Sequence, residues 1–176
     1  MRRAAGIVIL LAAFLGLSAG ATADAIAGRH SDNTQALQAG VLAELNATRH
    51  EHGLAPLRSS PSLAAAAQQH SVEMATNGYF SHNSANGTSF DHRISRYYAI
   101  GRYRYWSVGE NLLWSSPDVD PVTALRMWMN SPEHRANILA ARWRQIGISA
   151  VHVEAAPGMY GGAPVTVITT DFGVRH

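Results

Sequence analysis

The 176-residue sequence contains no cysteine and no lysine, and only 15% of its residues are charged. The absence of cysteine excludes disulfides, thiol nucleophiles and cysteine-based metal sites, so the fold must be stable through its core alone. Any metal site would have to use histidine, carboxylate and water. The 47% of apolar residues is typical of a globular chain, and the length fits a single domain.

Every basic side chain is an arginine, and no basic run is suited to nucleic acid. The 14 basic and 12 acidic residues give a formal net charge of +2. Removal of the first 23 residues would take away Arg2 and Arg3 and no acidic residue, which leaves 12 minus 12, a net charge of zero. We therefore exclude nucleic acid as a partner.

Residues 1–23 have the pattern of a secretory signal peptide. Arg2 and Arg3 precede an apolar run at 6–17, and small residues at 21–23 match a signal-peptidase site. The run is shorter than the roughly 20 apolar residues that cross a bilayer, and no later segment approaches that length. We therefore expect a secreted, extracellular chain without a transmembrane anchor. The polar, unpatterned segment 24–35 is expected to form a flexible mature N-terminus, before a domain at 36–176.

The rest of the chain predicts helices first and strands later. Apolar side chains at three- and four-residue steps predict a first helix from about Thr34, its expected cap, to Glu51. Ser60-Pro61 and Asp120-Pro121 each have the cap-and-proline pattern of a helix start. The remaining expected elements are a short helix at 90–98, an extended segment at 103–114, a helix at 131–139, and an antiparallel hairpin of strands at 146–153 and 165–172. This order favours an α+β sandwich.

Three residues are candidates for a site on physical grounds. Glu110 is a carboxylate on the apolar face of the extended segment, which is costly unless a partner or a metal satisfies it. His82 follows a helix at the start of a polar loop, and His134 lies in the first turn after Ser131-Pro132. Each could equally be a structural residue, and His70 is interpreted as a packed, hydrogen-bonded core histidine.

An aromatic and arginine-rich segment leaves two interpretations open. Tyrosines 97, 98, 103 and 105 and Trp106 surround arginines 93, 96, 102 and 104. This segment could line a cleft for carbohydrate or an apolar ligand, or it could consist of packed aromatics with solvated arginines.

Five ordered motifs resemble those of the CAP superfamily, the cysteine-rich secretory, antigen 5 and pathogenesis-related 1 proteins, in its bacterial SCP-like branch. The matching stretches include Tyr79-Phe80-Ser81-His82 and Gly109-Glu110-Asn111-Leu112. A longer one runs from Trp128 through Ser131-Pro132-Glu133-His134 to Leu139. The resemblance covers about residues 36–173, nearly the whole of the expected mature chain.

The resemblance implies an α-β-α sandwich with a small, mainly antiparallel sheet and an open central cleft. It assigns His82, Glu110 and His134 to the cleft, with Ser131 and Asn111 beside them, and in some members the histidines and carboxylates bind zinc or another divalent ion. The family's second glutamate falls on Ser131, which is better suited to cap a helix. Glu133 is a poor substitute, because adjacent helical residues point about 100° apart and should not face one cavity.

Two functions follow from this resemblance. The first is a non-catalytic extracellular binding module for a lipid, glycan or peptide, with or without a divalent metal held by His82, Glu110 and His134. The alternative is a metal-dependent extracellular hydrolase in which Glu110 acts as base or ligand. The missing second carboxylate counts against the hydrolase.

Overall fold

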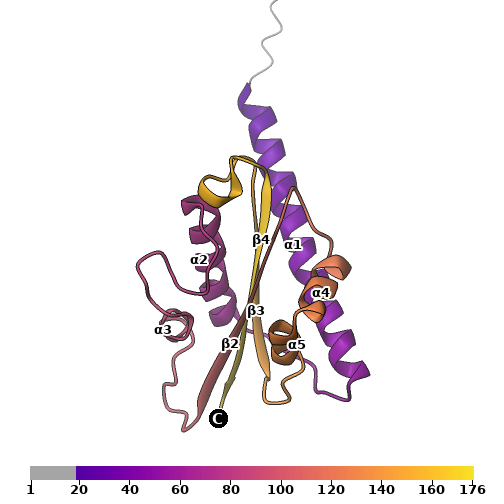
Figure 1. Ribbon diagram of the computed structural model, residues 1–176, viewed down its shortest axis with the longest axis vertical. Helices are drawn as coiled ribbons and strands as arrows, with labels where there is room; N and C mark the ends of the chain where they lie inside the picture. The colour runs from indigo at the N-terminus through magenta and orange to yellow at the C-terminus, as the bar shows by residue number, and fades with distance from the viewer. Residues whose placement is uncertain (1–18) are drawn as a thin grey trace, which may run out of the picture.

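The computed structural model describes residues 19–176, so most of the predicted signal peptide lies outside the described residues. Five α-helices, one short 3-10 helix and four strands follow one another in this part of the chain (Figure 1). Their order is α1 (Ala19–Glu51), β1 (Arg58–Ser59), α2 (Pro61–Asn77), α3 (Phe90–Ser95), β2 (Trp106–Ser115), α4 (Pro121–Asn130), α5 (Pro132–Ile138), β3 (Gln145–Val153), η1 (Gly158–Tyr160) and β4 (Val165–Arg175).

The four strands form one sheet in the order β1-β3-β4-β2. β3 and β4 pair antiparallel, which confirms the predicted hairpin, and β2 pairs antiparallel with β4 on the other side. β1 pairs parallel with β3 through only two residues and was not predicted. β2 is therefore an edge strand, and side chains of Trp128 and Asn137 donate to its carbonyl groups at Leu112 and Glu110. Such contacts occupy groups that another strand could otherwise pair with.

Helices cover both faces of the sheet. α2 and α3 lie on one side, and α1, α4 and α5 lie on the other (Figure 1). This arrangement confirms the predicted α+β class and the α-β-α sandwich. The predicted helix caps at Ser60 and Asp120 are also present, because each side chain accepts a hydrogen bond from the amide three residues later.

α1 begins earlier than the sequence predicted. It starts at Ala19 rather than near Thr34, so the segment 24–35, which we expected to be flexible, is helical. Alanine occurs at every second position from 19 to 27, and alanine has the highest helix propensity of all residues. Thr34 does not cap the helix, because its hydroxyl donates to the carbonyl of Ser31 in the preceding turn. The domain boundaries themselves stay a prediction.

Each helical layer has its own core against the sheet. Trp128, Trp143 and Phe172 are fully buried on the side of α1, α4 and α5. Leu63 and Met74 of α2 are fully buried on the other side. Burial of each large apolar side chain contributes about 1.5–3 kcal/mol, so these two cores account for the fold's stability without disulfides.

Gly147 fixes the spacing between α2 and the sheet. A Cβ atom on this β3 residue would lie 2.0 Å from the carbonyl carbon of Leu63, which is far inside van der Waals contact. Only glycine permits this close approach of helix and strand. Among residues 19–176, no helix combines the length and the apolar character needed to cross a membrane.

Candidate functional site

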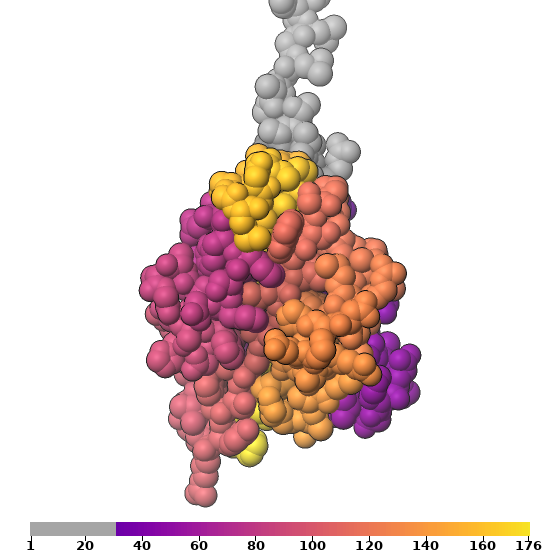
Figure 2. Space-filling model, viewed as in Figure 1, coloured from indigo at the N-terminus to yellow at the C-terminus, as the bar shows by residue number. Residues whose placement is uncertain are grey.

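An open cleft of about 710 Å³ runs along the edge strand β2, between α3 and α5. On the face shown in Figure 2, the segment with α2 and α3 lies to the left and the segment with α4 and α5 lies to the right. His82, Glu110, Asn111 and His134, all predicted to belong to the site, line this cleft. The other lining residues are Asn83, Ser89, Phe90, Val108, Gly109, Glu133, Ala136, Asn137, Ala140 and Arg142.

Glu110 provides the charged floor of the cleft, and its side chain is only 1% exposed. Its Oε1 lies 2.8 Å from Nδ1 of His82, and its Oε2 accepts a hydrogen bond from Nη2 of Arg93. Arg93 itself is fully buried on α3, and its Nη1 donates to the carbonyl of His82 at 2.9 Å. Of the two interpretations of the aromatic and arginine-rich segment, neither predicted a buried Arg93. The buried carboxylate requires a cationic partner, and Arg93 supplies it.

His82 connects the buried carboxylate to the open cleft. Its side chain is 51% exposed, in contrast to that of Glu110. A carboxylate at Nδ1 favours the tautomer with a proton on Nδ1, so the Nε2 atom is left to face a ligand. Glu110 thus orients the imidazole and sets which ring nitrogen meets solvent.

A second carboxyl group lies beneath Glu110. Asp171 on β4 is directly opposite Glu110 on β2 and is fully buried. Burial raises the pKa of Asp171 well above its usual range, and the negative charge of Glu110 raises it further. Asp171 is therefore held in its neutral form at a pH where Glu110 pairs with Arg93.

His70 of α2 is a fully buried core histidine, as predicted. Its Nε2 lies 2.8 Å from the carbonyl oxygen of Ser81, the residue before His82. Burial lowers the pKa of His70, although the nearby charge of Glu110 acts in the opposite direction. His70 therefore positions the chain segment that carries His82.

His134 lies across the cleft on α5. Burial lowers the pKa of His134, and the charge of His82 lowers it further, whereas Glu133 raises it. Contrary to the expectation from helical spacing, Glu133 and His134 both line the cleft. The cleft is open, so the first turn of α5 presents both neighbours at its rim. Glu133 is exposed there in the first turn, where the helix dipole favours a carboxylate.

Asparagine side chains fix the α5 wall of the cleft. Asn111 is fully buried and donates through Nδ2 to the carbonyl of His134 at 3.1 Å. Asn137 donates to Oδ1 of Asn111 and to the carbonyl of Glu110. Asn111 therefore supports the cleft from below. Ser131 does not line the cleft, and as the residue before α5 it makes no capping hydrogen bond with its side chain.

The arrangement does not fit the predicted metal site of His82, Glu110 and His134. Both oxygens of Glu110 are engaged by His82 and Arg93. In residues 19–176, no group of three or more histidine, cysteine or acidic side chains is placed to hold a metal ion. A zinc site with these three ligands would require Glu110 to release one oxygen, either Oε1 from His82 or Oε2 from Arg93.

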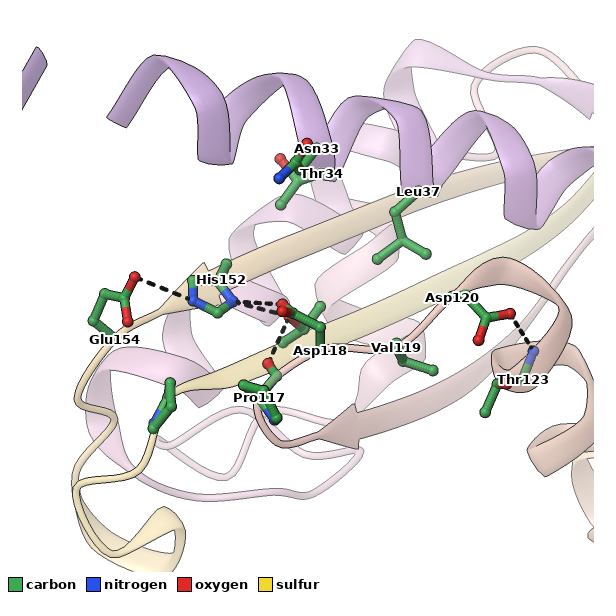
Figure 3. Close-up of a pocket in the computed structure, with 12 residues that line it drawn as sticks. Asn33, Thr34, Leu37, Pro117, Asp118, Val119, Asp120, Thr123, His152 and Glu154 are labelled. Atoms are coloured by element: carbon green, nitrogen blue, oxygen red, sulfur yellow. Dashed lines mark hydrogen bonds and ion pairs between the residues drawn. The ribbon is translucent and has the colours of Figure 1, made fainter. Parts of the chain in front are cut away.

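A second cavity, of about 690 Å³, lies between α1 and the segment that connects β2 to α4 (Figure 3). His152 of β3 lies there 3.2 Å from Oδ1 of Asp118 and 3.7 Å from Oε1 of Glu154. Thr166 donates to the same Asp118 oxygen at 3.2 Å. None of the predicted site residues lines this cavity, and the partners of His152 were not predicted.

Three residues that shape the cleft were not among the predicted site residues: Arg93, Asn137 and Asp171. Arg93 and Asn137 lie in short helices without a clear apolar period. Asp171 did carry a signal, because an acidic residue inside the apolar strand 165–172 is costly unless it is paired or neutral. Its position opposite Glu110 depends on strand register, which the sequence alone did not give.

The fold and the cleft define a CAP-type sandwich. A sequence profile of the cysteine-rich secretory protein (CAP) family matches residues 42–167. The chain belongs to this family.

Two proteins of Bacillus subtilis (strain 168) are similar in sequence. The uncharacterized protein YkwD is 34% identical over 107 residues, which is 60% of this chain and 39% of that protein. The uncharacterized membrane protein YlbC is 33% identical over 103 residues, 58% of this chain and 28% of that protein. The chain thus covers less than half the length of either relative.

Solved structures show the same fold. An extracellular protein containing an SCP domain, from Bacillus anthracis, is 26% identical with a TM-score of 0.63, over 82% of this chain and 42% of that one. An outer surface protein from Borrelia burgdorferi has 18% identity and a TM-score of 0.59, over 77% of this chain and 90% of that one. A cysteine-rich secretory protein from Staphylococcus aureus has 18% identity and a TM-score of 0.58, over 80% of this chain and 38% of that one. The last two support the fold alone.

Proposed function

We propose that this CAP domain is a non-catalytic extracellular binding module whose cleft takes a polar ligand, a glycan or a peptide. The observation that carries the proposal is the engagement of both oxygens of Glu110 by His82 and Arg93. A carboxylate held in this way orients other groups and is a poor general base, because neither oxygen is free to accept a proton from a ligand. This supports binding over the hydrolase alternative.

The lining of the cleft supports a polar ligand over a lipid. Hydrogen-bonding side chains come from both walls, with Asn83 and Ser89 on one side and Arg142 on the other. The apolar surface consists mainly of Phe90, Val108 and two alanines, and the cleft is open to solvent. An acyl chain would need a longer and more enclosed apolar channel. An extracellular location is supported by the signal-peptide pattern and by the Bacillus anthracis relative.

Calorimetric titration of the purified chain tests this proposal. The probes are N-acetylglucosamine tetrasaccharide, tetra-alanine, and phosphatidylcholine vesicles. We expect one of the first two to bind without being hydrolysed, and at least tenfold more weakly to His82→Ala than to wild type. The matched control is His92→Ala, an exposed histidine that does not line the cleft. Hydrolysis of a bound probe, binding of vesicles alone, or equal binding by His82→Ala would overturn the proposal.

A further inference from the structure

Three arginines converge on a pocket at the end of the sheet where β3 begins and β4 ends, near the C mark in Figure 1. Arg58 lies on β1, Arg144 immediately precedes β3, and Arg175 is the last residue of β4. Because β1, β3 and β4 are neighbours in the sheet, these three separate segments place their side chains around one hollow of about 440 Å³. No acidic residue lines it, and no lining residue belongs to the cleft.

Two of the guanidinium groups are held in position by the protein. Nη1 of Arg175 donates to the carbonyl of Ala99 at 2.8 Å, and its guanidinium lies 4.1 Å from the ring centre of Tyr98 and 5.1 Å from that of Tyr103. Nη1 of Arg144 donates to two backbone carbonyls, at 2.7 and 2.9 Å. A guanidinium has five N–H donors, so both groups keep donors for a ligand at little further entropic cost.

The positive charge of this pocket has no counterion within the described part of the chain. None of the three arginines forms an ion pair there, although carboxylates elsewhere in residues 19–176 do pair with arginine or histidine. A fourth guanidinium lies close to the pocket, because Nε of the buried Arg49 donates at 3.0 Å to the carbonyl of Ala55, a lining residue. Burial lowers the pKa of Arg49, and the charge of Arg144 adds to this lowering. Like charges gathered in this way repel one another, and a bound anion would offset the repulsion.

We propose that the pocket of Arg58, Arg144 and Arg175 binds a phosphate group. Guanidinium groups form paired, charge-assisted hydrogen bonds with phosphate oxygens. Phosphate presents oxygens in several directions and so suits donors from three segments better than the two coplanar oxygens of a carboxylate. The phosphate could belong to a soluble ester or to a lipid headgroup, and both would use the same contacts.

Calorimetry with inorganic phosphate at constant ionic strength tests the proposal on the purified chain. Arg58→Gln is the main variant, because the Arg58 side chain is exposed and makes no hydrogen bond that its loss would break in the described chain. We expect at least a tenfold weaker affinity in Arg58→Gln, and an intermediate affinity in Arg58→Lys, which keeps the charge and loses the paired geometry. The matched control Arg126→Gln makes the same charge change on an exposed face of α4 and should bind as wild type does.

Sedimentation with phosphatidylglycerol vesicles, beside phosphatidylcholine vesicles, identifies the source of the phosphate. Binding to phosphatidylglycerol that Arg58→Gln abolishes supports the proposal with a lipid headgroup as ligand. Binding of inorganic phosphate alone, again sensitive to Arg58→Gln, supports it with a soluble ester. The proposal is overturned if neither probe binds at millimolar phosphate, or if Arg126→Gln weakens binding as much as Arg58→Gln does. Thermal unfolding of each variant checks that the fold is retained.

Discussion

Glu110 on β2 and Asp171 on β4 occupy directly opposed positions, so two buried carboxyl groups lie side by side, and the buried Arg93 pairs with Glu110. Arg93 compensates a single negative charge. Burial and the neighbouring Glu110 raise the pKa of Asp171, which makes the pH dependence of stability the first property to measure.

Asp171→Asn should stabilise the protein at neutral pH. The pKa of Asp171 is raised in the folded state, so the native state disfavours ionisation of this carboxyl group. The contribution of Asp171 to stability therefore falls as pH rises above the unfolded pKa of 3.8. Asparagine mimics the neutral acid and avoids this loss. We expect a gain of about 1 kcal/mol in the free energy of unfolding at pH 7.5 and none near pH 4, measured by urea denaturation. Asp32→Asn, on an exposed turn of α1, is the control, and a gain that does not depend on pH would contradict the prediction.

Arg93 and Glu110 should be strongly coupled. Removal of either partner leaves an uncompensated buried charge, so Arg93→Met and Glu110→Gln should each cost about 3–5 kcal/mol of unfolding free energy. The double variant should cost clearly less than the sum, because it removes both charges together. Urea denaturation of the four proteins measures the coupling. Simple additivity would show that the two charges do not depend on each other.

His82 should influence the titration of His134 across the cleft. The pKa of His134 is lowered by burial first and by the charge of His82 second. In His82→Ala it should rise toward 6.5 without reaching it, because the burial remains. Because the pKa of His134 is lower in the folded than in the unfolded state, His134 destabilises the fold as pH falls through 6.5. This loss of stability should be smaller in His82→Ala than in the wild type. NMR titration of the imidazole measures the shift. His92→Ala should leave the pKa of His134 unchanged, and an unchanged value in His82→Ala would refute a direct interaction.

Zinc should bind more tightly once Arg93 is removed. In the wild-type arrangement one oxygen of Glu110 contacts Nδ1 of His82 and the other accepts from Arg93, so neither oxygen is free to ligate an ion. We expect Arg93→Met to bind zinc at least tenfold more tightly than wild type in calorimetric titration at pH 7, provided that circular dichroism shows it folded. Micromolar binding by the wild type that disappears in the His82→Ala, His134→Ala variant would instead establish a metal site of the predicted residues.

The fold was largely predictable because its signals are local. The caps at Ser60 and Asp120 and the β-branched strands at 146–153 and 165–172 depend on neighbouring residues alone. β1 was missed because two residues carry no periodic pattern, and their pairing with β3 is set by the chain around them. The start of α1 was misplaced because the amphipathic pattern begins only near Thr34. The alanine-rich residues before it have high helix propensity and extend the helix to Ala19.

The cleft was less predictable than the fold. The resemblance to CAP proteins placed His82, Glu110 and His134 near one another, but it said nothing of what Glu110 contacts. Its pairing with Arg93 depends on how α3 packs against β2, and its opposition to Asp171 depends on strand register. Both are long-range relationships. Because of them, the carboxylate among the candidate metal ligands belongs to a charge-compensated cluster.

The absence of a side chain at Gly147 also affects the cleft along β2 that His82 lines. The contact between β3 and Leu63 sets how deeply α2 sits, and the segment carrying His82 follows that helix and is anchored to it through His70. A methyl group added at position 147 would push the helix outward and carry the imidazole with it. The width of the cleft is therefore set in part by a residue outside its lining, so a substitution at position 147 is expected to change the cleft without changing any residue that lines it.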